Sequence, residues 1–192
     1  MRLFLACLLG LFLNISPALA DNLKFGLRGE VLPVAKVHTI YSQEGETLDA
    51  FVLRLGVWFR NFTTTSGYEA CGTLFQSNDG RYALPIFTNN SQIGCATPVV
   101  SLEGFVATNQ SVHSHPVEKS ATPNAQDKIF IRGTSQRFSA EYRQRRNLDP
   151  RTFSDIDFAG GPGFLVADGR VLHQSGPGLV RLVGELPPYQ AP

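Results

Sequence analysis

Two histidines stand one residue apart in the stretch SVHSHP, with Ser114 between them. Residues at positions i and i+2 of a β-strand point to the same face, so an extended chain sets the imidazoles of His113 and His115 side by side. Pro116 follows directly and favours the end of the strand, which leaves the pair at the start of a loop. Imidazole nitrogens are common ligands of zinc. The spacing therefore predicts that His113 and His115 bind one metal ion.

A hydrolytic zinc site needs further groups from elsewhere in the chain. Such a site has about three protein ligands and an open position for water, together with a carboxylate that accepts a proton from that water. Glu69 lies in the segment YEACGTLF, and Asp157 lies in FSDIDFA. Ser154 precedes Asp157 by three residues, a spacing typical of a helix N-terminus that begins at a serine cap. A cap of this kind would fix the direction of the Asp157 carboxylate.

This ordered set resembles the signature of a known family. The JAMM metallopeptidases of the JAB/MPN superfamily have a glutamate at the start of a strand, then His-x-His-Pro, then Ser-x-x-Asp. The resemblance extends over about residues 45–175 and is also seen to a bacterial, secreted JAB-like subgroup. It implies bound Zn²⁺, with Glu69 as the general base and Ser154 as a hydrogen-bond donor to the oxyanion. The metal ligands that it implies are His113, His115 and Asp157.

The chain departs from the family pattern in one respect. Ser154 follows His115 at a much greater distance than the corresponding serine of the family does. The segment PNAQD lies near the family distance, with Asn124 in place of the serine and Asp127 as the acid. We favour Asp157 as the third ligand, because its serine is intact and a predicted strand pair follows at once. Asp127 remains the alternative.

The first twenty residues have the pattern of a signal peptide. Arg2 gives a positive start, an apolar run follows, and Ala18-Leu19-Ala20 is a small-residue cleavage pattern. The run is too short to span a bilayer comfortably. We therefore expect cleavage near Asp21, a periplasmic or secreted protein, and no membrane insertion of the mature chain.

The mature chain of about 170 residues fits one domain, over residues 21–192. Cleavage removes Arg2 and leaves 16 basic against 16 acidic residues, and this neutral balance argues against nucleic acid as a partner. One local cluster is basic and is either a solvated helical face or a patch for an anionic substrate or partner. Its members are Arg132, Arg137, Arg143, Arg145, Arg146 and Arg151.

Two cysteines remain after cleavage, because Cys7 lies in the apolar run. In an oxidising compartment the pair Cys71 and Cys95 favours a disulfide. The alternative is that both thiols join the histidines around the metal.

The elements that must position these residues alternate between strands and helices. Residues 21–45 indicate strand and turn, and residues 47–62 have the apolar spacing of an amphipathic helix, ended by TTTSG. The runs YEACGTLFQS and RYALPIFTN flank Asp79-Gly80 and predict a hairpin. Pro85 in the second run indicates an edge strand or a bulge. The run GFVATNQSVHSHP predicts the strand that ends at the two histidines.

The second half changes character. Residues 117–153 are polar and rich in arginine, and we expect an insertion or lid with helices at about 124–132 and 139–146. The segment GFLVADGRVLHQ predicts another hairpin, and LVRLVGEL a last strand. This order predicts an α/β domain with a single mixed β-sheet and flanking helices. By resemblance it would be a JAB/MPN domain, related to the cytidine-deaminase fold.

These observations predict a secreted or periplasmic zinc-dependent amide-bond hydrolase, a peptidase or isopeptidase of JAMM type. An exported enzyme would meet peptides, cell-wall cross-links or a co-secreted protein as substrate. The alternative is a non-enzymatic binding protein on the same scaffold, such as an accessory or immunity protein of a secreted toxin system. A zinc deaminase is set aside, because the chain lacks the His-x-Glu and Pro-Cys-x-x-Cys pattern.

Overall fold

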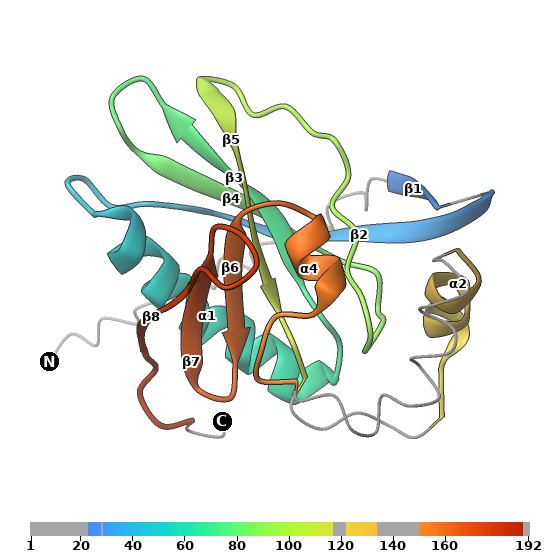
Figure 1. The fold of residues 1–192 in the computed structure, drawn as a ribbon. Coiled ribbons are helices and arrows are strands. Elements are labelled where there is room, and N and C mark those ends of the chain that lie inside the picture. The colour runs from blue at the N-terminus through green and yellow to red at the C-terminus, as the bar shows by residue number, and fades with distance from the viewer. Residues whose placement is uncertain (1–22, 28, 117–121, 134–149, 190–192) are drawn as a thin grey trace, which may run out of the picture.

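The computed structural model describes residues 23–27, 29–116, 122–133 and 150–189 (Figure 1). The predicted signal peptide and the predicted helix at 139–146 lie outside these ranges. The elements, in chain order, are β1 (Leu23–Leu27), β2 (Glu30–Tyr41), α1 (Leu48–Ser66), β3 (Cys71–Ser77), β4 (Tyr82–Thr88), β5 (Phe105–Ser114), α2 (Ala125–Gly133), α4 (Asp155–Ala159), β6 (Gly163–Ala167), β7 (Arg170–Gln174) and β8 (Val180–Glu185). No helix in the described part of the chain is long and apolar enough to cross a membrane.

One mixed sheet holds all eight strands, in the order β1-β2-β4-β3-β5-β6-β7-β8. Neighbouring strands are antiparallel except β5 and β6, which run parallel and are joined by the long arginine-rich connection. The expected α/β class with a mixed sheet is therefore confirmed. The β6–β7 hairpin turns at Asp168 and Gly169, whose φ values of 48° and 70° suit the type I′ turn that matches strand twist.

Helix α1 begins and ends at clear capping residues. The Thr47 side chain accepts the N–H of Ala50, and Gly67 adopts the left-handed conformation at the C-terminus, where its N–H donates to the Thr63 carbonyl. The predicted end at residue 62 was wrong, because the helix continues to Ser66. Thr63 is buried against the sheet, and the left-handed glycine that stops a helix comes only after the threonine run.

The two faces of the sheet carry different clusters around β6. Phe164 and Val166 pack with α1, whereas the alternate residues Leu165 and Ala167 pack with Phe153 on the opposite face. Figure 1 shows α1 behind β6 and β7, and α4 in front of the sheet. Strand β6 is therefore covered on both faces, and the end of β5 that pairs with it lies within the covered part of the molecule.

Pro85 lies inside the sheet and not at its edge, since β4 is flanked by β2 and β3. The edge-strand interpretation was wrong. Strands β3 and β4 pair at Cys71 with Phe87 and again at Phe75 with Ala83, but not at the residues between. The same register places Pro85 opposite Thr73, within this unpaired stretch. The missing proline N–H is thus accommodated by a local break in the ladder.

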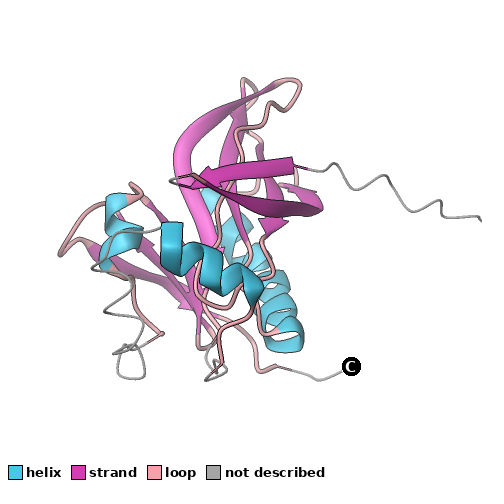
Figure 2. Cartoon of the chain, turned by 90° about the vertical axis from the view of Figure 1, so that its right-hand side faces the viewer, coloured by secondary structure: helices cyan, strands magenta, loops and turns pink. Residues whose placement is uncertain are grey.

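Helix α2 confirms the first predicted helix of the insertion. Its Phe130 packs with Leu32 of β2 and with Ile93 and Ala96 of the preceding loop. In Figure 2 this helix faces the viewer below the paired strands β1 and β2. The insertion therefore begins by covering the β2 side of the sheet, away from β6 and β7.

Candidate metal centre

The two histidines lie at the end of β5, on the face opposite α1. Val112 and the alternate residue Ser114 are fully buried toward α1, so strand alternation directs His113 and His115 to the other side. The Nδ1 atom of His115 lies 3.1 Å from the carbonyl oxygen of Pro150. A carbonyl only accepts, so this contact places the proton of a neutral imidazole on Nδ1 and leaves the Nε2 lone pair available.

Asp157 belongs to the short helix α4, which begins at a capping box. The Ser154 Oγ accepts the N–H of Asp157 at 3.3 Å, and the Asp157 Oδ2 accepts the backbone N–H of Ser154 at 2.7 Å. The Ser154 hydroxyl also lies 2.8 Å from Oδ2. These bonds fix the rotamer of Asp157, as the sequence spacing predicted.

The histidines and Asp157 meet at one point. The Nε2 of His113 lies 3.2 Å from Oδ1 of Asp157, and the Nε2 of His115 lies 3.6 Å from Oδ2. One ligand atom from each of the three side chains lies within 4.8 Å of the others. Ligands about 2.1 Å from a tetrahedral zinc ion lie about 3.4 Å from one another. The observed separations therefore suit a single ion of that size.

The electrostatics of the group favour an ionised acid. Burial alone would raise the pKa of Asp157, but the neighbouring charge and hydrogen bond of His113, the charge of His115 and the Ser154 N–H together hold that pKa well below its ordinary value. The acid that faces the imidazoles is thus a carboxylate at neutral pH.

Glu69 lies two residues before β3, the strand that pairs with the histidine strand. Cys71 pairs with His113 in the register of β3 and β5, and the Ser114 N–H donates to the Ala70 carbonyl at 3.0 Å. The Glu69 N–H donates instead to the Ser91 carbonyl at 2.8 Å. Glu69 is 4% exposed and is not one of the three grouped residues.

Asp127, the alternative third ligand, is committed to another network. Its fully buried carboxylate accepts hydrogen bonds from the Ser91 hydroxyl, the backbone N–H and side-chain amide of Gln92, and the Asn124 N–H. Asn124 caps α2, and its Oδ1 accepts the Asp127 N–H at 2.8 Å. Of the two aspartates, only Asp157 lies with the histidines.

The cysteines form a disulfide, Cys71–Cys95, with Cα atoms 5.8 Å apart. The disulfide prediction is confirmed, and the alternative that both thiols bind the metal was wrong. The bond ties the first residue of β3, directly beside His113, to the loop that follows β4.

The two other histidines of the chain are not part of the group. His38 is exposed on β2, and His173 Nε2 lies 3.3 Å from the Gln110 side chain. Of the basic cluster, Arg132 pairs with Glu30 and Arg151 with Asp168. The remaining four arginines lie outside the described residues.

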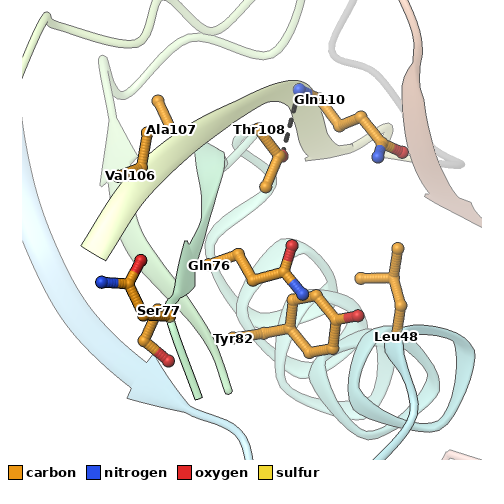
Figure 3. A pocket seen from close by; sticks show the side chains of 9 residues that line it. Leu48, Gln76, Ser77, Tyr82, Val106, Ala107, Thr108 and Gln110 are labelled. Carbon is orange, nitrogen blue, oxygen red and sulfur yellow. Dashed lines mark hydrogen bonds between the residues drawn. The ribbon is translucent and has the colours of Figure 1, made fainter. Parts of the chain in front are cut away.

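A separate hollow lies at the other end of β5. It has a volume of about 610 Å³ and is lined by residues that include Leu48, Gln76, Tyr82 and Thr108 (Figure 3). No histidine, cysteine or carboxylate is among the described residues that line it. It therefore offers none of the ligands that the centre requires.

The sequence reasoning overlooked two residues that support the centre. Pro150 supplies the carbonyl at His115, and no side-chain pattern identifies a backbone acceptor. Ser114 bonds to α1 and to Ala70. Its signal was available, because strand alternation puts the residue between two outward histidines on the helix side.

No protein-family model, curated protein or solved structure matches the chain. Function must therefore be argued from the centre itself.

Proposed function

We propose that the protein is an exported zinc-dependent amide-bond hydrolase, a peptidase or isopeptidase whose site is of the JAMM type. One observation carries the proposal: His113, His115 and Asp157 come from segments far apart in the sequence, yet their ligand atoms lie within 4.8 Å of one another. Two imidazoles and one carboxylate are a ligand set of catalytic zinc sites, which keep a position open for water.

The ligands fit zinc in a second respect. The Pro150 carbonyl at His115 Nδ1 orients the ring, as outer hydrogen bonds do for metal-binding histidines. Zinc, when bound, lowers the pKa of a coordinated water from about 15.7 toward about 7 and polarises a substrate carbonyl. His113, His115 and Asp157 would hold the ion, and their low exposure keeps bulk water away from it.

Glu69 would be the general base. The proposal is supported by its position two residues before Cys71, which pairs with His113, and by its not being one of the three grouped residues. It would accept the proton of the attacking water and then deliver it to the leaving amine as the C–N bond breaks. Water thereby contributes its hydroxyl to the carbonyl carbon and its proton to the nitrogen.

Ser154 would donate a hydrogen bond to the oxyanion that forms at the scissile carbonyl. Its hydroxyl now lies 2.8 Å from Asp157 Oδ2. The role therefore requires the hydroxyl to rotate from the ligand carboxylate toward the substrate, while the backbone N–H of Ser154 keeps its own bond to Asp157.

The disulfide supports export, because cytosolic thiols are kept reduced. In that setting the substrate class is a peptide, a cell-wall cross-link or a co-secreted protein. The proposal is tested by incubating the protein with a mixture of candidate substrates: defined synthetic peptides, lysine isopeptide conjugates and cell-wall muropeptides. Mass spectrometry detects which of them are cleaved.

The first measurement is metal content. Purified wild-type protein is expected to hold about one zinc per chain by elemental analysis, and His113→Ala with His115→Ala to hold none. Glu69→Gln is expected to keep the zinc and to lose hydrolysis, because it removes the proton acceptor and no ligand. Full activity of metal-free protein would refute the proposal, as would a Glu69→Gln variant that cleaves at the wild-type rate.

A further inference from the structure

Ser114 stands between the two histidines, and its side chain points the other way, into the core. Its Oγ lies 2.7 Å from the Thr63 hydroxyl of α1 and accepts the backbone N–H of Ala70 at 3.1 Å. Its backbone N–H donates to the Ala70 carbonyl at 3.0 Å. One buried serine therefore joins α1, β5 and the residue that follows Glu69.

The bond to Ala70 replaces a ladder bond. Opposite residues in a hydrogen-bonded antiparallel pair exchange two N–H···O=C bonds. Between Ser114 and Ala70 the first is made, but the Ala70 N–H goes to the Ser114 hydroxyl. His115, the residue after β5, donates its N–H to Val166 of β6, as expected because successive N–H groups of a central strand point to opposite neighbours. The Ser114 hydroxyl thus takes the place of one ladder bond where the pairing of β5 with β3 ends.

The other side of the segment is held independently. The Glu69 N–H donates to the Ser91 carbonyl, and the Thr88 hydroxyl donates to the Glu69 carbonyl, both at 2.8 Å. These bonds attach Glu69 to the turn after β4. The bonds that join this segment to β5 include the two that Ser114 makes with Ala70.

We infer that Ser114 is a positioning residue that sets the Glu69 carboxylate at its working distance from the histidine pair. The inference rests on the proposed function. Ser114 touches neither substrate nor metal, and acts by fixing the backbone at Ala70. A displacement of about 1 Å in a catalytic group can lower a rate about 100-fold, so a backbone at Ala70 that is loosened by loss of this bond is sufficient to weaken proton transfer.

The test is the variant Ser114→Ala, with the peptide that wild-type protein cleaves fastest in the mixture above. We expect kcat to fall about 100-fold, while KM and zinc content stay at wild-type values, because both histidines and Asp157 are intact. Amide hydrogen exchange followed by NMR is expected to show slow exchange of the Ala70 N–H in wild-type protein and faster exchange in Ser114→Ala.

Thr108→Val is the matched control. The Thr108 hydroxyl of β5 also bonds the β3 backbone, at the Leu74 carbonyl 3.1 Å away, but at the far end of the strand pair. It is expected to leave kcat and Ala70 exchange unchanged. An unchanged kcat in Ser114→Ala would overturn the inference, as would fast exchange of Ala70 in wild-type protein. Wild-type protein without zinc would instead refute the proposed function, and the Ala70 exchange measurement would still test the Ser114 link.

Discussion

Two aspartates of this chain each follow a capping residue by three positions, and the fold gives them opposite tasks. Asp127, with Asn124 as its cap, is fully buried and surrounded by donors from the loop after β4. Asp157, with Ser154 as its cap, faces two imidazoles instead. A carboxylate surrounded by donors of the fold has a structural role, whereas one aimed at two ring nitrogens is a candidate metal ligand.

Alanine at the two positions should therefore have opposite effects. Asp127→Ala is expected to lower the free energy of unfolding of metal-free protein by about 3 kcal/mol, because several buried donors lose their acceptor, and to leave zinc binding intact. Asp157→Ala is expected to abolish zinc binding at a cost of about 1 kcal/mol, the usual effect of losing a cap interaction. Denaturant unfolding and elemental analysis measure both quantities. Zinc retained in Asp157→Ala would show that this carboxylate is not a ligand.

The sequence identified the histidine pair and the disulfide because each follows a short-range rule. His113 and His115 share a face by strand alternation, and Cys71 and Cys95 are the two cysteines that follow residue 20. It left the third ligand open between two aspartates, because Ser-x-x-Asp and Asn-x-x-Asp are both good helix starts. Only the placement of α4 against β5, a long-range contact, separates them.

At the scale of elements, the sequence predicted most of the described strands and helices, but not the position of Pro85 in the sheet or the end of α1. The hairpin at Asp79-Gly80 was found from its turn residues, yet Pro85 was read as a sign of an edge strand or a bulge, and the edge part of that prediction was wrong. Edge or centre is decided by strand order, which depends on contacts between distant segments. The end of α1 was missed for a similar reason, because burial of Thr63 against the sheet outweighs the weak helix preference of the threonine run.

The cap of α4 has a matched counterpart in α2, which allows its structural and catalytic parts to be separated. Ser154→Ala and Asn124→Ala are each expected to lower the free energy of unfolding by about 1 kcal/mol through loss of the cap. Only Ser154→Ala is expected to lower kcat, by about 100-fold or more, because it also removes the oxyanion donor. Unfolding and cleavage assays on the two variants decide this, and an equal kcat in both would remove Ser154 from the proposed mechanism.

The turn between β2 and α1 should give the fold a weak dependence on pH. The Nε and Nη2 atoms of Arg54 donate hydrogen bonds to the Glu46 carboxylate at 2.8 and 2.7 Å. These bonds lower the pKa of Glu46 from its ordinary value of 4.5, although burial acts in the opposite direction. Since the folded-state pKa is the lower one, the stabilisation is complete above the ordinary pKa and is lost as the pH falls below it.

Glu46→Gln should therefore be less stable than wild-type protein at pH about 7 by about 0.5–1 kcal/mol, because Arg54 is partly exposed to solvent. The difference should shrink as the pH falls toward about 3. Urea unfolding at the two pH values measures it. A difference that stays constant would show that the ion pair does not contribute through the charge of Glu46.

At the scale of the whole molecule, the centre joins parts of the chain that the sheet alone does not fix together. His113 belongs to β5, which is paired with both β3 and β6, and His115 follows its last residue. Asp157 instead lies on a five-residue helix with no fully buried residue. Helix α4 is held by its capping box, by contacts such as that of Phe158 with Phe153, and by the ligand contact itself. A bound ion would strengthen the attachment of α4 to β5. It would thereby link the two ends of the long connection between β5 and β6.

Zinc should consequently stabilise the folded protein. At a free concentration about 100 times its dissociation constant, a ligand that binds only the folded state adds about 2.7 kcal/mol to the free energy of unfolding. We expect thermal unfolding of metal-free wild-type protein to shift upward on addition of zinc, with no shift in His113→Ala. Glu69→Gln should keep the full shift, because Glu69 is not one of the three grouped residues. If Glu69→Gln lost the shift, the glutamate would belong to the coordination sphere, and the assignment of a base separate from three ligands would have to be abandoned.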